Sequence, residues 1–251
     1  MVSSRLQKSL PFLGLCMVLF VVGCTTVSPP KSASLSVTTT TAQTEQLGWW
    51  YARFQIEWPK DAEPHWHMDV LLALEVLAPI IEEYRSEMAL WRFHRRAARD
   101  AAGHQFSFIF YAEPNVAARI FESIRAHSLT PELQKAGKLL AVTCDTTAAV
   151  QKPNVEDTSD RNWSPVLQRS WPYFIMGVSE LWLTLVSQIA EGQTPRSRPA
   201  TLDAKLDFYR KVDQTVQTLW HREGGHALLH HLNAIFQYEP LVVNRRETMQ
   251  F

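Results

Sequence analysis

Apolar and polar positions alternate with a period of two along several short stretches of the chain. Residues 50–58 place Ala52, Phe54, Ile56 and Trp58 on one side and polar residues on the other. This period predicts a half-buried β-strand. Residues 88–96 and 105–111 have the same period and flank a segment containing Gly103, which predicts a hairpin. Residues 138–144 predict a fourth strand.

Between these strands the apolar spacing changes to three and four residues, which is typical of amphipathic helices. It predicts one helix over residues 67–85, bent or divided by Pro79, and a second helix that begins near Pro114. The predicted order is strand, helix, strand, strand, helix, strand. We therefore expect residues 47–145 to form an α+β domain, a ferredoxin-like split βαβ sandwich.

Residues 146–251 have a different pattern and predict a C-terminal helical layer packed on that domain. Apolar stripes of helical spacing occur within residues 170–192, 202–219 and 227–236. We expect Gly224-Gly225 to end the second of these helices, because glycine is common just after a helix C-terminus.

The first 23 residues have the pattern of an export signal. Arg5 and Lys8 precede an apolar run over residues 10–22, which is shorter than the roughly 20 residues that span a bilayer as a helix. Residues 25–46 are rich in Ser and Thr and poor in large apolar side chains. We interpret them as a flexible tether, with a span of roughly 25 Å as a random coil.

Val21-Val22-Gly23-Cys24 resembles the lipobox of bacterial lipoproteins. The resemblance implies that Cys24 becomes the lipidated first residue of the mature chain and that its acyl chains hold the protein at a membrane. It also implies, from Thr25 after the cysteine, sorting to the outer membrane with the domain facing the periplasm. Residues 24–46 would then be the lipidated cysteine and its tether.

Charge and cysteine content narrow the possible partners. Removal of residues 1–23 takes away Arg5 and Lys8 and no acid, which leaves 23 basic and 25 acidic residues, a formal charge of −2. This balance does not favour nucleic acid as a partner. Cys16 leaves with the signal and Cys24 is modified, so Cys144 remains as a lone thiol and no internal disulfide is possible. A lone thiol of this kind is more often a small buried hydrophobe than a nucleophile.

Histidines gather in residues 221–231, HREGGHALLHH. His226 and His230 are four residues apart, so on a helix they share a face and could chelate a metal such as zinc. The glutamate of a zincin motif is missing between them. His221, His231, Glu223, His65 or His67 would have to supply a third ligand. The alternative is that these histidines lie on the partly exposed side of a helix.

A basic strip lies on the outward side of the second predicted strand. Arg92, His94 and Arg96 point the same way, together with Arg53 on the first strand. Such side chains can bind a carboxylate or phosphate, or form a solvated face with ordinary ion pairs. Known short enzyme motifs are absent: GVSEL at residues 177–181 lacks the final glycine of a G-x-S-x-G elbow, and the chain has no phosphate loop, dinucleotide fingerprint or C-x-x-C.

Two segments resemble the C-terminal domain of lantibiotic dehydratases and thiopeptide-type biosynthesis proteins. Residues 91–95, WRFHR, followed by Gly103-His104, are similar to that family's W-F-F-x-R-Y…G-x-H segment, and residues 230–233, HHLN, to its H-x-H-L-N segment. The resemblance implies a peptide-modifying scaffold with a peptide-binding cleft. The corresponding catalytic candidates would be His94, Arg95, His104 and His231. The arginines of the family's L-R-L-R-F strand are replaced in residues 105–110.

Three functions follow as hypotheses. The sequence favours a lipid-anchored envelope protein that has no cofactor, is not an enzyme, and binds a peptide, protein or small-molecule ligand in the periplasm. One alternative is a lyase-like enzyme on the peptide-modifying scaffold. The other is a metal-binding lipoprotein that uses His226 and His230 with zinc.

Overall fold

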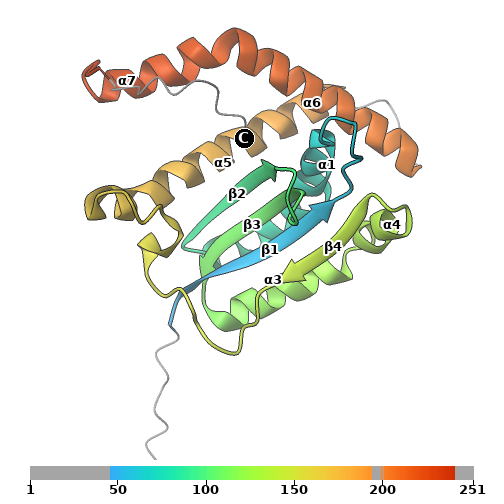
Figure 1. Ribbon diagram of the computed structural model, residues 1–251, viewed down its shortest axis with the longest axis horizontal. Coiled ribbons are helices and arrows are strands. Elements are labelled where there is room, and N and C mark those ends of the chain that lie inside the picture. Colours follow the sequence, from blue (N-terminus) through green and yellow to red (C-terminus); the bar gives the residue numbers. More distant parts are fainter. Residues whose placement is uncertain (1–45, 194–198, 200, 241–251) are drawn as a thin grey trace, which may run out of the picture. The chain divides into compact units, whose positions relative to one another are not determined.

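The computed structural model describes residues 46–193, 199 and 201–240. The predicted signal segment, Cys24 and all of the predicted tether except Gln46 lie outside these residues. The described part has mixed α+β architecture, with a four-stranded antiparallel sheet and several helices (Figure 1).

The four predicted strands are all present. They are β1 (Gly48–Ile56), β2 (Leu90–Ala97), β3 (His104–Ala112) and β4 (Leu139–Cys144). Their order across the sheet is β2-β3-β1-β4, and every neighbouring pair is antiparallel. The strand β1 therefore lies inside the sheet, hydrogen bonded on both sides, although it is the first strand of the chain.

The helical crossover between β1 and β2 is divided near the predicted proline. It consists of α1 (Trp66–Leu71), a π-helical turn η1 (Leu72–Leu77) and α2 (Ala78–Tyr84), and ends in the short helix η2 (Arg85–Glu87). Pro79 stands in the first turn of α2, directly after the π-helical turn, and has no N–H to donate to the preceding turn.

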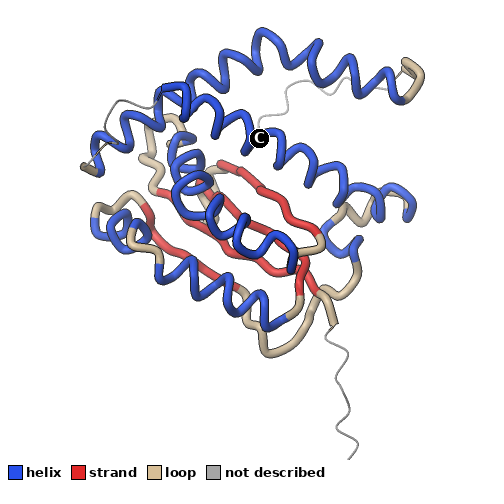
Figure 2. The backbone as a smooth tube through the Cα atoms, turned by 180° about the vertical axis from the view of Figure 1, so that it is seen from behind, coloured by secondary structure: helices blue, strands red, loops and turns tan. Residues whose placement is uncertain are grey.

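The second crossover contains α3 (Pro114–Ala126) and α4 (Leu129–Lys135). Figure 2 shows the α1–α2 segment and α3 in front of the strands, so these helices cover one face of the sheet. Between this helical layer and the sheet lies the main core. Its inward side chains on β1 and β3 are at most 2% exposed, as the alternation predicts: Trp50, Ala52, Phe54, Ile56, Phe106, Phe108 and Phe110.

The C-terminal helices lie beside the edge strand β2. They are α5 (Pro165–Gln193), α6 (Leu202–Gly224), η4 (Gly225–His230) and α7 (His231–Ile235), preceded by the short helix η3 (Val155–Thr158). The helix α5 packs along β2, and α6 packs against both α1 and α5 (Figure 1). The hydroxyl of Ser179 on α5 accepts a hydrogen bond from the backbone N–H of Phe93 on β2 at 3.1 Å. The predicted helical layer is therefore present.

The helix α6 ends at Gly224 with Gly225 as its C-cap, as the glycine pair predicts. The glycines do not interrupt the helical path, however: both have right-handed helical backbone angles, and the chain continues through the π-helical turn η4 into α7. Gly224 also allows a close approach, since a Cβ at this position would lie 2.8 Å from the indole ring of Trp220.

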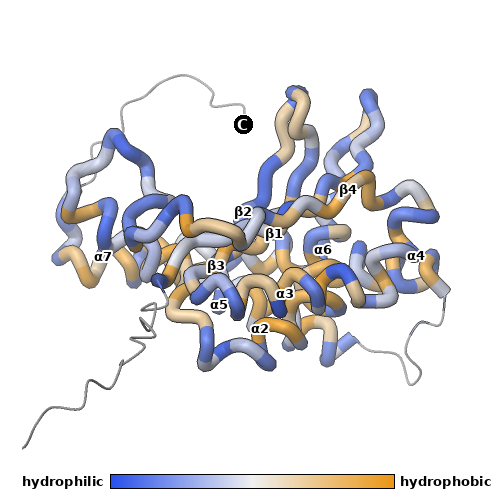
Figure 3. Tube along the Cα trace, turned by 90° about the horizontal axis from the view of Figure 1, so that it is seen from below, coloured by the Kyte–Doolittle hydropathy of each residue, from blue (hydrophilic) through white to orange (hydrophobic). Residues whose placement is uncertain are grey.

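The other face of the sheet is covered only in part. Figure 3, an edge-on view, shows α2 and α3 on the far side of the strands from this outer face. One end of the outer face carries a second apolar cluster of Trp49, Leu90, Ile109 and Tyr111, against which Val155 and Met176 pack. The rest of this face carries cationic side chains.

Candidate functional site

A fully buried carboxylate marks the candidate site. Asp69 lies on α1 among apolar residues and is 0% exposed. A carboxylate removed from water in this way needs charged or hydrogen-bonding partners. The sheet supplies them: Arg95 on β2 pairs with Phe106 in the sheet register, so it points to the core side, as does His104 at the start of β3.

Arg95 and His104 meet at Asp69 from two strands. The Nε of Arg95 donates to Oδ2 of Asp69 at 2.7 Å, and Nε2 of His104 lies 3.0 Å from Oδ1. Arg95 also donates from Nη2 to the backbone carbonyl of Trp66 at 3.1 Å. Its guanidinium lies 5.2 Å from the ring centre of Trp66 and 4.9 Å from that of Trp182, distances typical of cation–π contacts. We call Asp69, Arg95 and His104 the buried network.

A second carboxylate approaches the same guanidinium from α6. Oδ1 of Asp213 lies 3.7 Å from Nη2 of Arg95, and Oδ2 accepts a hydrogen bond from Gln217 at 2.7 Å. Burial raises the pKa of Asp213 above its usual value, and the charge of Asp69 acts in the same direction, while Arg95 acts against them. The site thus has two carboxylates for one guanidinium, and Arg95 lies closer to Asp69.

A pocket of about 340 Å³ opens beside the buried network, between α1, β2 and α6. We call it the Trp66–Trp220 pocket. Its lining residues are Trp66, Arg95, Asp213, Val216, Gln217 and Trp220. The pocket combines two indole rings with the carboxylate of Asp213, whereas Asp69 and His104 lie behind it with no exposed surface.

The predicted catalytic candidates are separated by the fold. Arg95 and His104 meet through Asp69, but His104 is fully buried and does not line the pocket. His94 lies on the opposite face of the sheet from Arg95, because neighbouring residues of a strand point to opposite sides. His231 lies on α7, where its ring is next to those of His226 and His230. The four candidates therefore do not gather in one pocket.

Asp69 and Asp213 were missed by the sequence analysis, although each leaves a signal. Asp69 begins a stripe that continues with Leu72, Ala73 and Val76, the spacing of a buried helix face. Asp213 comes four residues after Tyr209 in the apolar stripe of α6. A charged residue inside such a stripe indicates a buried polar site, but its partners on other elements are not visible in the pattern.

The histidine cluster forms, but its surroundings do not complete a metal site. The rings of His226 and His230 are stacked with centres 5.0 Å apart, and His231 lies 5.4 Å from His226. Within residues 46–193, 199 and 201–240, no group of three or more His, Cys, Asp or Glu side chains is placed to hold a metal ion. The zinc hypothesis therefore has no third ligand in this part of the chain, and the three histidines are exposed or partly exposed.

The basic strip lies on one face, as predicted, and two of its four members are paired. Arg53 forms an ion pair with Asp145 at 2.8 Å, and Arg96 forms one with Asp100 at 2.6 Å. Arg92 has no ion pair with any described residue, which sets it apart from these two.

The thiol of Cys144 on β4 is a weaker nucleophile than a free cysteine, because burial raises its pKa.

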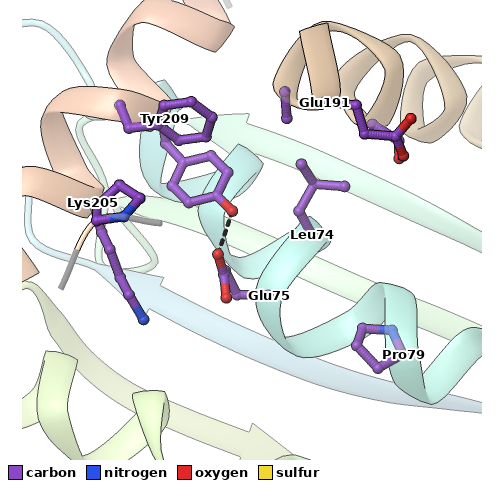
Figure 4. Close-up of a pocket in the computed structure, with 10 residues that line it drawn as sticks. Leu74, Glu75, Pro79, Glu191, Lys205 and Tyr209 are labelled. Carbon is purple, nitrogen blue, oxygen red and sulfur yellow. Dashed lines mark hydrogen bonds between the residues drawn. The ribbon is translucent and has the colours of Figure 1, made fainter. Parts of the chain in front are cut away.

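A larger groove of about 460 Å³ lies between α2, α5 and α6, and Figure 4 shows part of its lining. In it the hydroxyl of Tyr209 donates a hydrogen bond to the carboxylate of Glu75. Pro199 forms one wall, and the residues on either side of it lie outside the described part of the chain. We therefore assign no ligand to this groove.

Comparison of the chain with protein-family models, curated proteins and solved structures finds no match. The resemblances to lipoproteins and to peptide-modifying enzymes therefore stay predictions.

Proposed function

We propose that this chain is a lipid-anchored protein of the cell envelope whose domain binds an organic cation, such as an amine or a basic peptide side chain, in the Trp66–Trp220 pocket. The anchor is Cys24, and the domain faces the periplasm from the outer membrane. The observation that carries the binding function is the carboxylate of Asp213 beside two indole rings, which shares Arg95 with Asp69 and lies farther from it than Asp69 does.

Charge balance supports a cation as the ligand. Arg95 donates directly to Asp69 at 2.7 Å but lies 3.7 Å from Asp213, so one guanidinium serves two carboxylates. A cation held against Oδ1 of Asp213 would restore the balance. The indole rings of Trp66 and Trp220, which line the pocket, also favour a cation, because an indole ring attracts positive charge through its quadrupole, as the contact of Arg95 with Trp66 illustrates.

Burial of the polar groups supports binding rather than catalysis. A catalytic acid or base must reach the substrate directly or through one water. Neither Asp69 nor His104 has exposed surface, and His94 lies on the other face of the sheet. Arg95, at 27% side-chain exposure, is the member of the buried network that also lines the pocket.

We also infer that the sheet and its two helical crossovers form a ferredoxin-like split βαβ sandwich. The strand order β2-β3-β1-β4, the antiparallel neighbours and the placement of α1–α2 and α3 on one face support this topology. In this arrangement the buried network joins the first crossover helix to the hairpin of β2 and β3.

The binding function is tested by titrating the full-length protein with lysine amide, arginine amide and short basic peptides, and with acidic peptides of equal length. Tryptophan fluorescence reports binding, because two indole rings line the pocket. We expect basic ligands to bind and Asp213→Asn to weaken them at least tenfold. Trp220→Ala should also weaken binding, whereas Tyr173→Ala, at an exposed position on α5 outside this pocket, should not. Equal binding of the acidic peptides would reject the proposal.

The anchor is tested separately by labelling cells with radioactive palmitate. The intact chain should incorporate the label and Cys24→Ser should not. Mature protein that begins at another residue, or has no acyl chains by mass spectrometry, would reject the anchor and leave the binding result unaffected.

A further inference from the structure

Arg92 is an anomaly on the outer face of the sheet. Its Nε is buried and has no hydrogen-bond partner, and no described acidic residue pairs with its guanidinium. The neighbouring outward arginines differ, since Asp145 holds Arg53 and Asp100 holds Arg96. Arg92 as a whole is partly buried. Removing a charge from water without a partner is costly, so an unpaired guanidinium with a buried Nε calls for an explanation.

The sheet register places further cations around Arg92. Arg92 on β2 is opposite Ile109 on β3, which is opposite Tyr51 on β1. In the next row His94 is opposite Ser107, which is opposite Arg53. Opposite residues in a sheet lie on the same face, so the side chains of both rows share the outer face.

The part of β3 on this face is buried. Ile109 and Ser107 are each 2% exposed, although they point away from the helices that cover the inner face. Ile109 belongs to the second apolar cluster, against which Tyr51, Val155 and Met176 pack. Tyr51 brings two more charges to the same place: its ring centre lies 4.5 Å from the guanidinium carbon of Arg53 and 4.0 Å from Nζ of Lys152.

We call Arg53, Arg92, His94 and Lys152 the outer basic patch. Asp145 neutralises Arg53, while Arg92 and Lys152 have no ion pair with any residue in the described ranges. Burial and the charges of Arg92 and Arg96 lower the pKa of His94, which is the response expected of a histidine among cations without a counter-charge. Positive charge is thus concentrated on one face of a chain whose total charge is close to zero.

We propose that the outer basic patch binds a phosphate group, with Arg92 as its main ligand. A guanidinium donates from a planar fork that matches two phosphate oxygens. The ammonium of Lys152, on the loop after β4, lies over the ring of Tyr51, in the same row of the sheet as Arg92. Cations from two strands and a loop on one face suit a tetrahedral anion with several oxygens. The anion supplies the partner that Arg92 lacks. This site is separate from the Trp66–Trp220 pocket, because Arg92 and Arg95 point to opposite faces of the sheet.

The test uses inorganic phosphate and the detergent-solubilised full-length protein. Thermal stability and calorimetric binding are measured against increasing phosphate, with chloride adjusted to keep the ionic strength constant. We expect phosphate to raise the melting temperature of the wild type. Arg92→Leu should weaken phosphate binding at least tenfold and abolish the shift.

Arg96→Leu is the matched control, since Arg96 is on the same strand and the same face but is held by Asp100. It should bind phosphate within twofold of the wild type. If Arg92→Leu does not fold, Arg92→Gln replaces it. No phosphate effect on the wild type beyond that of chloride, or equal losses in the Arg92 and Arg96 variants, would overturn the proposal.

A second experiment distinguishes the two sources of the phosphate. The full-length Cys24→Ser chain, which cannot be acylated at that position, is sedimented with vesicles of phosphatidylglycerol and of phosphatidylcholine. Binding to phosphatidylglycerol that Arg92→Leu removes would assign the site to a lipid headgroup. Phosphate binding that depends on Arg92, without such vesicle binding, would assign it to a soluble phosphate ester.

Discussion

Replacing Asp69 with Asn tests the buried network most directly. The change keeps the size of the side chain but removes the charge that Arg95 contacts at 2.7 Å and that lies 3.0 Å from His104. Breaking a fully buried pair by removing one partner costs about 3–5 kcal/mol. Arg95 is 27% exposed and keeps the carbonyl of Trp66 and its proximity to Asp213, so we expect about 2–3 kcal/mol at this site.

Thermal and urea unfolding followed by circular dichroism measure the effect. For a domain of this size the loss corresponds to a fall in melting temperature of about 5–10 °C. The control is Glu180→Gln, which removes a charge from the exposed ion pair with Arg85 and should cost less than about 1 kcal/mol. If Asp69→Asn lowers the free energy of unfolding no more than Glu180→Gln does, the network does not hold α1 on the sheet, and the reasoning fails.

Three further predictions concern pH and packing. Burial and Arg210 lower the pKa of His67 to about 4, below its unfolded value of 6.5. The free energy of unfolding therefore falls by about 1–2 kcal/mol as the pH falls from 6.5 to 4. In His67→Asn the midpoint of urea unfolding should depend less on pH over this range. Because the pKa of Asp213 is raised, its contribution to stability is lost as the pH rises through the folded pKa. Asp213→Asn should therefore raise the melting temperature more at pH 7 than at pH 4, while it removes ligand binding; a variant less stable than the wild type at pH 7 would contradict this. A Cβ at Gly48 would collide with Cγ1 of Val150, so Gly48→Ala should cost about 1–3 kcal/mol by urea unfolding, and Val150→Ala in the same chain should recover part of the loss.

Periodicity was sufficient to predict the strands and the direction of their side chains. The alternation along β1 placed Ala52, Phe54 and Ile56 in the core, and all three are at most 1% exposed. It also placed Arg92 and Arg96 on the outer face. The pairing of these arginines could not be predicted in the same way, because their partners would come from loops, whose geometry has no period.

The candidate site was predictable only in part. The family resemblance predicts Arg95 and His104, and they do lie in one network, but the residue that joins them is Asp69 on α1, the helix that follows β1 in the chain. Asp69 can contact both residues only because α1 packs against β2 and β3, and this packing is not visible in the sequence pattern. Gly224 shows a different limit: the glycine pair predicts the end of α6 at this position, but not the close approach of the Trp220 ring or the helical turn that follows.

The position of β1 in the sheet has a mechanical consequence for an anchored protein. Any pull from a membrane attachment at Cys24 would enter the domain at Gly48, the first residue of β1. This strand is bonded to β3 on one side and β4 on the other, so a force along it loads both ladders of hydrogen bonds in shear. An edge strand in the same position would open one bond at a time. Under the proposed anchor, the domain would therefore receive tension at a strand that is bonded on both sides.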